Sequence, residues 1–138
     1  VARVKSGRGV AAAELGIHLV GAPAMARLNA RHLGHAGPTD VIAFDYGAPV
    51  GIPSRPGGLG GDIVICLDVA RRQARDFRTP WQLELVRYLV HGLLHLAGFD
   101  DRAPAERQRM KRIERRLVRR LAARLGLSGL RPRSRLRP

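Results

Sequence analysis

Short runs of apolar and β-branched residues predict three strands along the chain. The runs are L-G-I-H-L-V at residues 15–20, V-I-A-F-D-Y at 41–46 and D-I-V-I-C-L at 62–67. The third run is nearly all apolar, which is typical of a strand in the centre of a sheet. Asp68 follows this run directly and is the expected N-cap of a helix that ends near Phe77.

A short helix and two loops are expected between these strands. The helix begins at Ala22, and Met25 and Leu28 lie on its apolar face. Residues 34–39 and 47–60 are rich in glycine or proline and predict loops. The chain therefore alternates strands, helices and loops without an internal repeat.

A long helix in the second half of the chain has the clearest start signal. The stretch T-P-W-Q, which begins at Thr79, matches a capping box with threonine at the cap. The helix is expected to run to about Ala97, and Gly98 is a natural C-terminal breaker. Leu85 and Leu96 widen its apolar stripe, which predicts burial on most sides. The stripe consists of Val86, Leu89, Val90, Leu93 and Ala97.

A last, amphipathic helix is expected to begin near Pro104 and to end at Gly126. Arginine is the commonest residue outside its apolar stripe. The stripe consists of Met110, Ile113, Leu117, Leu121 and Leu125. Residues 127–138 read as a basic, disordered tail. Three strands and four helices predict one α+β domain over residues 1–126, with a small mixed sheet and a buried central helix.

Length and composition agree with a single globular domain. The chain has 138 residues, of which 45% are hydrophobic. No apolar run reaches the roughly 18 residues needed to cross a membrane, and the first residues lack the core of a signal peptide. Cys66 is the only cysteine, which excludes an internal disulfide and makes the cytoplasm the default location. The first residue is Val1, so the N-terminus is expected to be incomplete.

The net charge of +14 is concentrated in the C-terminal part of the chain. Residues 101–138 hold thirteen arginines and one lysine against three acids, whereas the first 100 residues hold eleven bases and eight acids. A concentrated cationic segment favours a polyanion such as RNA, and arginine suits bidentate phosphate contacts. A GC-rich coding sequence would also place arginine on a solvated helix face, so charge alone leaves both interpretations open.

The segment H-G-L-L-H-L-A-G-F-D-D, which begins at His91, has the spacing of a metal site. His91 and His95 lie one helical turn apart, so both imidazoles can reach one ion. Gly98 lets the chain turn back, and Asp101 can then approach the same ion. H-x-x-x-H-x-x-G-x-x-D is the spacing of the extended zincin motif, with a carboxylate at the third-ligand position. Two histidines and a carboxylate form a known catalytic zinc set that leaves a position for water.

The neighbouring residues refine this hypothesis. Two histidines at this spacing alone would more often satisfy hydrogen bonds in a core, but Gly98 and Asp101 favour a metal. Glu84 and Tyr88 share the histidine face of the predicted helix. Gly92 stands where a metalloprotease carries its general-base glutamate, which opposes peptide hydrolysis but not metal binding.

The same segment resembles H-G-x-L-H-L-x-G-Y-D-H, the signature of the YbeY family of bacterial rRNA maturation factors and metal-dependent endoribonucleases. Met110 and Glu114 also fit the M-x-x-x-E of that family's last helix, and the resemblance covers about residues 15–122. The family's usual strand and helix ahead of the first predicted strand would not both fit into residues 1–14. Three further segments resemble the family in the same order: L-N-A-R-H-L-G-H-A-G-P-T-D-V-I-A-F (28–44), L-G-G-D-I-V-I-C (59–66) and D-V-A-R-R-Q-A (68–74).

The resemblance implies a zincin-like fold and a single-strand-specific endoribonuclease that acts in 16S rRNA 3′-end maturation and ribosome quality control. It implies one zinc ion per chain, held by His91, His95 and Asp101, which would activate water and polarise a phosphoryl oxygen. Nickel or cobalt would fit the same donors. The implied partners are rRNA and the small ribosomal subunit in the cytoplasm, with no membrane and no small-molecule cofactor.

Other carboxylates could assist this chemistry. Asp100 or Asp62 could orient the water. For Asp62, as for Thr39 and Asp40, a hydrogen bond within a turn is the preferred interpretation. Aromatic residues are few and most are expected to be buried, so charge and shape should dominate RNA recognition over base stacking.

Two positions depart from the family pattern and keep other functions open. Asp101 replaces the family's third histidine, and Leu33 replaces an arginine that is thought to act on the phosphate backbone. Arg31 and His32 are close enough in sequence to be candidate substitutes for that arginine. A ribosome-assembly or RNA-binding factor with a structural metal therefore remains an alternative, and a metalloprotease-like hydrolase is a second one. The expected phosphate contacts of the last helix are Arg112, Arg116 and Arg119.

Overall fold

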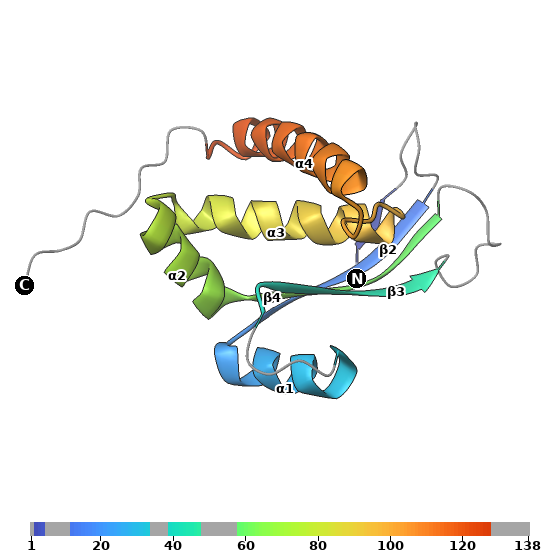
Figure 1. The fold of residues 1–138 in the computed structure, drawn as a ribbon, viewed down its shortest axis with the longest axis horizontal. Helices are drawn as coiled ribbons and strands as arrows, with labels where there is room; N and C mark the ends of the chain where they lie inside the picture. Colours follow the sequence, from blue (N-terminus) through green and yellow to red (C-terminus); the bar gives the residue numbers. More distant parts are fainter. Residues whose placement is uncertain (1, 5–11, 34–38, 48–57, 128–138) are drawn as a thin grey trace, which may run out of the picture.

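The computed structural model describes residues 2–4, 12–33, 39–47 and 58–127, which form one sheet and four helices (Figure 1). The strands, in chain order, are β1 (Ala2–Val4), β2 (Ala12–Val20), β3 (Val41–Gly47) and β4 (Gly58–Cys66). The helices are α1 (Ala22–Leu33), α2 (Leu67–Phe77), α3 (Trp81–Leu96) and α4 (Pro104–Arg124). The strand order is β1-β2-β4-β3; β4 is parallel to β2, and the other pairs are antiparallel. The predicted α+β fold with a mixed sheet is confirmed.

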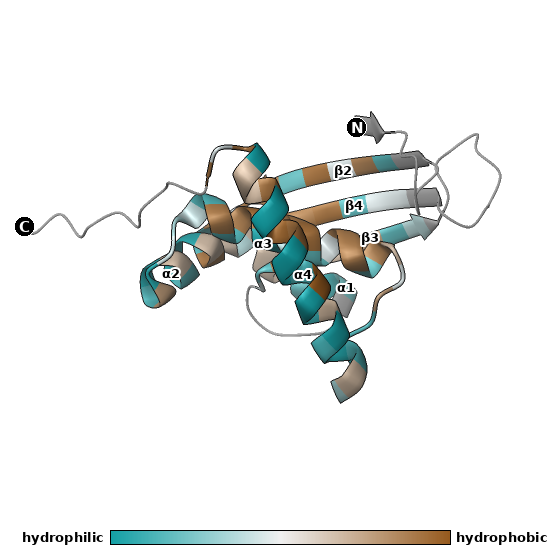
Figure 2. Cartoon of the chain, turned by 90° about the horizontal axis from the view of Figure 1, so that it is seen from above, coloured by the Kyte–Doolittle hydropathy of each residue, from teal (hydrophilic) through white to brown (hydrophobic). Residues whose placement is uncertain are grey.

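The sheet separates two helical layers. α1 covers one face, α3 covers the other, and α4 packs on the outer side of α3 (Figure 1). Met25 and Val64 belong to the core between α1 and the sheet, whereas Ile63 and Tyr88 belong to the core between the sheet and α3. A third cluster around Met110 joins α3 to α4. Figure 2 shows the consequence in hydropathy: α3 is mostly hydrophobic and α4 is mostly hydrophilic.

Two glycines allow α3 to lie close to β4. A Cβ atom at Gly92 would come within 2.9 Å of Cγ2 of Ile63. A Cβ atom at Gly61 would overlap the carbonyl oxygen of Phe44 and would lie 2.9 Å from Cδ2 of Leu96. Both contacts are tighter than side chains normally tolerate, so the absence of a side chain at these positions sets the distance between helix and sheet. The half of α3 that carries the histidines is thereby fixed.

The predicted strands were placed correctly, but their limits were wrong. β2 begins at Ala12 rather than at residue 15, because Ala12–Leu15 pair with Gly58–Gly61 of β4. β4 ends at Cys66, and Leu67 already belongs to α2. β1 is an additional strand that the sequence pattern did not predict, and it pairs with β2.

Both predicted helix caps were wrong. The N-cap of α2 is Cys66, and the Asp68 carboxylate instead accepts a hydrogen bond of 2.7 Å from the backbone N–H of Ala22, at the start of α1. The N-cap of α3 is Pro80, whose carbonyl accepts the first helical hydrogen bonds. The Thr79 hydroxyl donates to the Glu84 carboxylate at 3.0 Å instead of capping the helix.

Burial differs from the prediction at a few positions. Ala97 and Leu125 were expected in apolar stripes but are exposed. The aromatic residues were expected to be mostly buried, yet Tyr46 and Phe77 are exposed and, of the six, only Tyr88 is fully buried. The predicted tail, apart from residue 127, and most of both predicted loops lie outside the described residues. Within the described residues, none of the helices has the length and apolarity that a membrane crossing requires.

The close contact at Gly61 yields a test of the packing. We expect Gly61→Ala to lower the free energy of unfolding by about 2 kcal/mol or more, because the new methyl group meets a backbone oxygen that cannot move aside. Urea denaturation followed by circular dichroism measures this loss. Gly21→Ala is the matched control, since its Cβ would meet only side-chain atoms, Oδ2 of Asp68 at 3.3 Å and Cδ of Pro23 at 3.8 Å. Equal stability of the two variants would contradict the proposed packing.

Candidate metal centre

Helix α3 presents both histidines on one polar stripe between its two apolar sides. Gly92 faces Ile63 of the sheet, and Val90 and Leu94 pack toward α4. His91 and His95 lie between these contacts, with about a third of each side chain exposed. The helix therefore holds two imidazoles rigidly at its C-terminal end while leaving them accessible from one side.

The donor atoms of His91, His95 and Asp101 converge on one point, as predicted. The two Nε2 atoms are 3.1 Å apart. Oδ2 of Asp101 lies 3.7 Å from Nε2 of His95 and 4.0 Å from Nε2 of His91. Two ligands at about 2.0–2.1 Å from a tetrahedral zinc ion are roughly 3.3–3.4 Å apart. The imidazole pair is therefore spaced for one ion, and the carboxylate lies slightly farther away. The structure places no other such group among its described residues.

Each imidazole is oriented by a partner at its other nitrogen. Nδ1 of His91 lies 2.8 Å from Oε2 of Glu114 on α4, and Nδ1 of His95 lies 3.1 Å from the carbonyl oxygen of Phe99. Both partners accept hydrogen bonds, so both Nδ1 atoms carry the proton and both Nε2 lone pairs face each other. A shared proton or a metal ion between the nitrogens would satisfy this pair, and the nearby Asp101 carboxylate adds the third donor that a metal ion requires.

Glu114 also determines the electrostatics of His91. Its hydrogen bond raises the pKa of His91 above the ordinary value, against the opposing effect of burial. The negative charges of Glu114, Asp40 and Asp101 act in the same direction as that hydrogen bond. The local field thus favours positive charge beside His91, whether a proton or a metal ion carries it.

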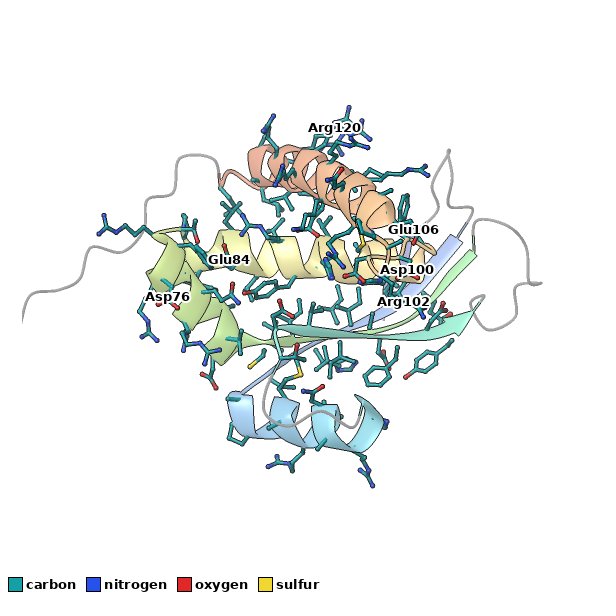
Figure 3. All side chains as sticks on the ribbon, viewed as in Figure 1. Asp76, Glu84, Asp100, Arg102, Glu106 and Arg120 are labelled. Carbon is teal, nitrogen blue, oxygen red and sulfur yellow. The ribbon has the colours of Figure 1, made fainter. Side chains whose placement is uncertain are left out.

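A tight turn after α3 brings Asp101 back to the histidines. Gly98 has a φ of 97°, and the N–H of Phe99 donates to the carbonyl of Leu94, which closes the helix end. One oxygen of Asp100 accepts the backbone N–H groups of Asp101 and Arg102, at 2.7 and 3.1 Å. Figure 3 labels Asp100 and Arg102 in this turn at the C-terminal end of α3.

Arg107 ties the same turn to α4. Its Nε donates to the carbonyl oxygen of Asp101 at 3.0 Å, and its Nη2 donates to that of Arg102 at 3.3 Å. The backbone of the third candidate ligand is therefore held by Asp100 on one side and by Arg107 on the other. These hydrogen bonds hold the turn in place although it is exposed to solvent.

A pocket of about 260 Å³ opens beside the metal group and continues along α3. His91 and Asp101 form one end of its wall, and Glu84 and Tyr88 lie farther back, which confirms that they share the histidine face. Figure 3 shows Glu84 toward the opposite end of α3 from Asp100. Cationic and acidic side chains both contribute to the lining. The cations are Arg87, Arg107 and Lys111, and the other carboxylates are Asp40 and Glu114.

The other predicted carboxylates lie elsewhere or act on the backbone. Asp62 is in the middle of β4 rather than in a turn, and its oxygens accept from Tyr46 at 2.8 Å and contact His18 at 3.3 Å. Asp40 makes the expected turn bond to the N–H of Val41 at 2.8 Å and, in addition, lines the pocket. The Asp100 carboxylate is engaged by Arg102 and by the backbone of the turn.

The predicted RNA contacts are not brought to the metal group. Arg31 and His32 are exposed on α1, which covers the opposite face of the sheet from α3 (Figure 1). The His32 ring packs edge-on against the Phe44 ring, with 5.2 Å between the ring centroids. Arg112, Arg116 and Arg119 are exposed on α4, but none of them is part of the pocket wall.

Sequence reasoning did not assign a role to Glu114 or to Arg107. The M-x-x-x-E spacing pointed to Glu114, but nothing in the sequence related it to a histidine 23 residues earlier. Arg107 is one of many arginines on α4, and only its bonds to the turn single it out.

Metal affinity tests this assignment. We expect wild-type protein without a histidine tag to bind about one zinc ion per chain and Asp101→Ala to lose most of it. Glu114→Gln should weaken binding by about 10–100-fold, because the His91 ring loses its anionic partner. Zinc titration with mass-spectrometric metal content gives both values. Glu106→Gln, on the exposed first turn of the same helix, is the control and should bind normally. Full zinc retention in Asp101→Ala would assign the third position to another group.

Comparison with known proteins identifies the family. The family model described as Endoribonuclease YbeY matches residues 2–122. The chain is 40% identical over 110 residues to Endoribonuclease YbeY of Chlorobium luteolum, a match that covers 80% of this chain and 75% of that protein. It is 46% identical over 111 residues to the protein of the same name from Anaeromyxobacter sp., covering 80% of this chain and 56% of that one. It is 41% identical over 112 residues to the protein of the same name from Frankia alni, a match that covers 77% of this chain and 62% of that protein. The chain thus spans less than two thirds of the last two relatives.

A solved structure supports the fold. The solution structure of TM1509 from Thermotoga maritima superposes with a TM-score of 0.63, at 22% sequence identity, and the match covers 88% of this chain and 77% of that one. The family model spans most of the chain and includes the complete metal group. This chain therefore belongs to the YbeY endoribonuclease family.

Proposed function

We propose that this chain is a metal-dependent endoribonuclease that hydrolyses phosphodiester bonds in single-stranded RNA. The supporting observation is the convergence of two imidazoles and one carboxylate at a pocket with three cationic side chains in its wall. The relatives that carry the name endoribonuclease support the same reaction class. An ion held by His91, His95 and Asp101 would supply Lewis-acid activation of water and of a phosphoryl oxygen.

Zinc is the proposed metal, with one ion per chain. Two imidazoles and a carboxylate suit zinc, and nickel or cobalt would accept the same donors. Structural zinc sites are closed by four protein ligands, whereas catalytic sites keep an open position. Here three candidate ligands converge and 43% of the Asp101 side chain is exposed, which favours a catalytic ion over a purely structural one.

The packing of α3 disfavours the metalloprotease alternative. A protease of this spacing places its general-base glutamate directly after the first histidine. That position is Gly92, and even a Cβ atom there would lie 2.9 Å from the fully buried Ile63. The position faces the sheet rather than the pocket, so it offers no room for a general base.

The cations of the pocket wall are proposed to hold the RNA phosphates. Leu33 occupies the family's arginine position, and Arg31 and His32 lie on the far side of the sheet. Arg107 and Lys111 line the same pocket as the metal group and carry the charge that a phosphate requires.

Two further assignments follow from these positions. The outward arginines Arg112, Arg116 and Arg119 would attract RNA through their long-range field. Asp100 is proposed to act by holding Asp101 in place, since the backbone and Arg102 already engage its carboxylate.

The proposed biological substrate is the rRNA of the small ribosomal subunit, with a role in 16S 3′-end maturation and ribosome quality control in the cytoplasm. Family membership supports this assignment, and the cationic face of α4 suits a large RNA target.

Metal-dependent cleavage of RNA tests the proposed reaction. Zinc-loaded wild-type protein should cleave a single-stranded RNA oligonucleotide, a chelator should abolish cleavage, and added zinc should restore it. His91→Ala should lower kcat/KM by about 100-fold or more, because the ion loses a ligand. The control is His18→Ala, which removes an exposed imidazole on β2. Cleavage that survives unchanged in His91→Ala would point to a contaminating nuclease and would refute the proposal.

Two neighbouring cations on α4 separate local contacts from general charge. Lys111 lines the pocket, whereas the adjacent Arg112 is exposed outside it. Lys111→Gln should raise KM for single-stranded RNA about tenfold and reduce the slope of log affinity against log salt by about 0.7, as one phosphate contact is lost. Arg112→Gln removes the same charge and should change both quantities less. Equal effects in the two variants would mean that Lys111 makes no specific phosphate contact.

A further inference from the structure

The pocket continues beyond the metal group into a compartment of different character. Glu84 and Tyr88 lie farther along α3 from the metal group, and Gln73 of α2 and Asp40, whose charge acts on both Tyr88 and His91, belong to the same wall. Tyr88 is three residues before His91 and therefore lies about 4.5 Å from it along the helix axis. A group bound beside Tyr88 would be the immediate neighbour of a group at the metal.

The hydroxyl group of Tyr88 has no partner in this compartment. The residue is 4% exposed, and its oxygen has no hydrogen bond of ordinary geometry to any residue that the structure describes, although the Glu84 carboxylate lies near enough to interact with it. Burial, followed by the negative charges of Glu84 and Asp40, raises the pKa of the phenol far above its ordinary value. The hydroxyl therefore stays protonated and remains a donor. Buried polar groups are nearly always paired, so an unpaired hydroxyl in a pocket wall is available to a ligand atom or to a water molecule that a ligand would displace.

The charges around Tyr88 limit what that ligand can be. One oxygen of Glu84 accepts from Arg87 at 2.7 Å and from Thr79 at 3.0 Å, and the carboxylate is almost fully buried. Asp40 adds a second carboxylate to the same wall. Arg87 offsets the charge of Glu84 but not that of Asp40, so this part of the wall has no net positive charge to hold a phosphate, whereas Lys111 and Arg107 provide one. A neutral group that both donates and accepts hydrogen bonds fits best.

A ribose hydroxyl meets this requirement. It can accept from a phenol and donate to a carboxylate, and the 2′-hydroxyl is the group by which proteins distinguish RNA from DNA. The pocket volume of about 260 Å³ is near the lower limit of small-ligand sites, which suits one sugar unit rather than a helix of RNA.

We propose that Tyr88 donates a hydrogen bond to the 2′-hydroxyl of the nucleotide next to the scissile phosphate and thereby selects RNA over DNA. The proposal deepens the endoribonuclease function and rests on it for the position of the scissile phosphate. The metal group binds the reacting phosphate, the pocket cations hold its neighbours, and the Tyr88 compartment recognises the sugar.

The experiment compares Tyr88→Phe with wild type on a short oligouridylate and the corresponding oligodeoxyuridylate. Binding is measured by fluorescence anisotropy in the presence of a chelator, so that no cleavage occurs. Wild type should bind the ribose oligonucleotide about tenfold more tightly, and Tyr88→Phe should reduce this ratio to nearly one, mainly by weakening the ribose complex. Removal of an unpaired hydroxyl should leave the fold intact, and a thermal melt checks this. Tyr46→Phe is the matched control, because Tyr46 is exposed and bonds to Asp62.

Cleavage gives a second measurement, in which the position of the modified sugar relative to the cleavage site is known. Oligonucleotides with one 2′-deoxy sugar beside the cleavage site should be poor substrates for zinc-loaded wild type and should be cut by Tyr88→Phe at the same rate as unmodified RNA. Equal binding of ribose and deoxyribose by wild type, or an unchanged ratio in Tyr88→Phe, would overturn the proposal. Selective binding without any zinc-dependent cleavage would support the Tyr88 contact and refute the endoribonuclease function, so the two failures are distinguishable.

Discussion

The whole arrangement depends on the burial of α3 from two opposite sides. The sheet covers one side, through Ile63 and the side-chain-free surface at Gly61 and Gly92, and α4 covers the other. Only a narrow stripe of the helix remains for polar groups, and all of its chemistry must lie there. Because both sides are fixed by packing, the two imidazoles are held with little freedom. Rigid ligands lose little conformational entropy when an ion binds.

The third ligand is held by a different principle. Asp101 belongs to a turn that packing does not fix, so hydrogen bonds replace packing there. Asp100 binds the backbone N–H groups of the turn, and Arg107 binds two of its carbonyl groups. The two imidazoles are thus positioned by packing and the carboxylate by hydrogen bonds, so the three candidate ligands are held by independent interactions.

The sequence predicted those parts of the site that are local in the chain. The spacing of His91, His95 and Asp101, with Gly98 between them, was sufficient because one helix and one turn contain all of these residues. The partner of His91 is on another helix, and the contact depends on how α4 packs, which no short pattern encodes. The same reason explains the error at Asp68, where a tertiary partner prevailed over a local capping option; the hydroxyl of Thr79 instead binds Glu84, five residues later in the adjoining helix. The predicted start of β2 was wrong for a similar reason, because pairing with β4 extends this strand into residues of low strand propensity.

The distribution of charge suggests how a strongly basic protein can still recognise RNA selectively. Helix α4 carries eight of the 23 arginines, and those on its exposed face, such as Arg112, Arg116 and Arg119, lie where solvent and salt weaken any single contact and where attraction is independent of sequence and sugar. The pocket is different, because there cations and carboxylates share a small, partly enclosed space in which each charge acts strongly. In the proposed complex, the carboxylates near Tyr88 would disfavour a phosphate there, so the phosphates would lie beside Lys111 and the sugar beside Tyr88. In this proposal, the arginines of α4 attract RNA and the pocket residues select its sugar. The acidic groups of the pocket contribute to this selection by repelling the phosphates.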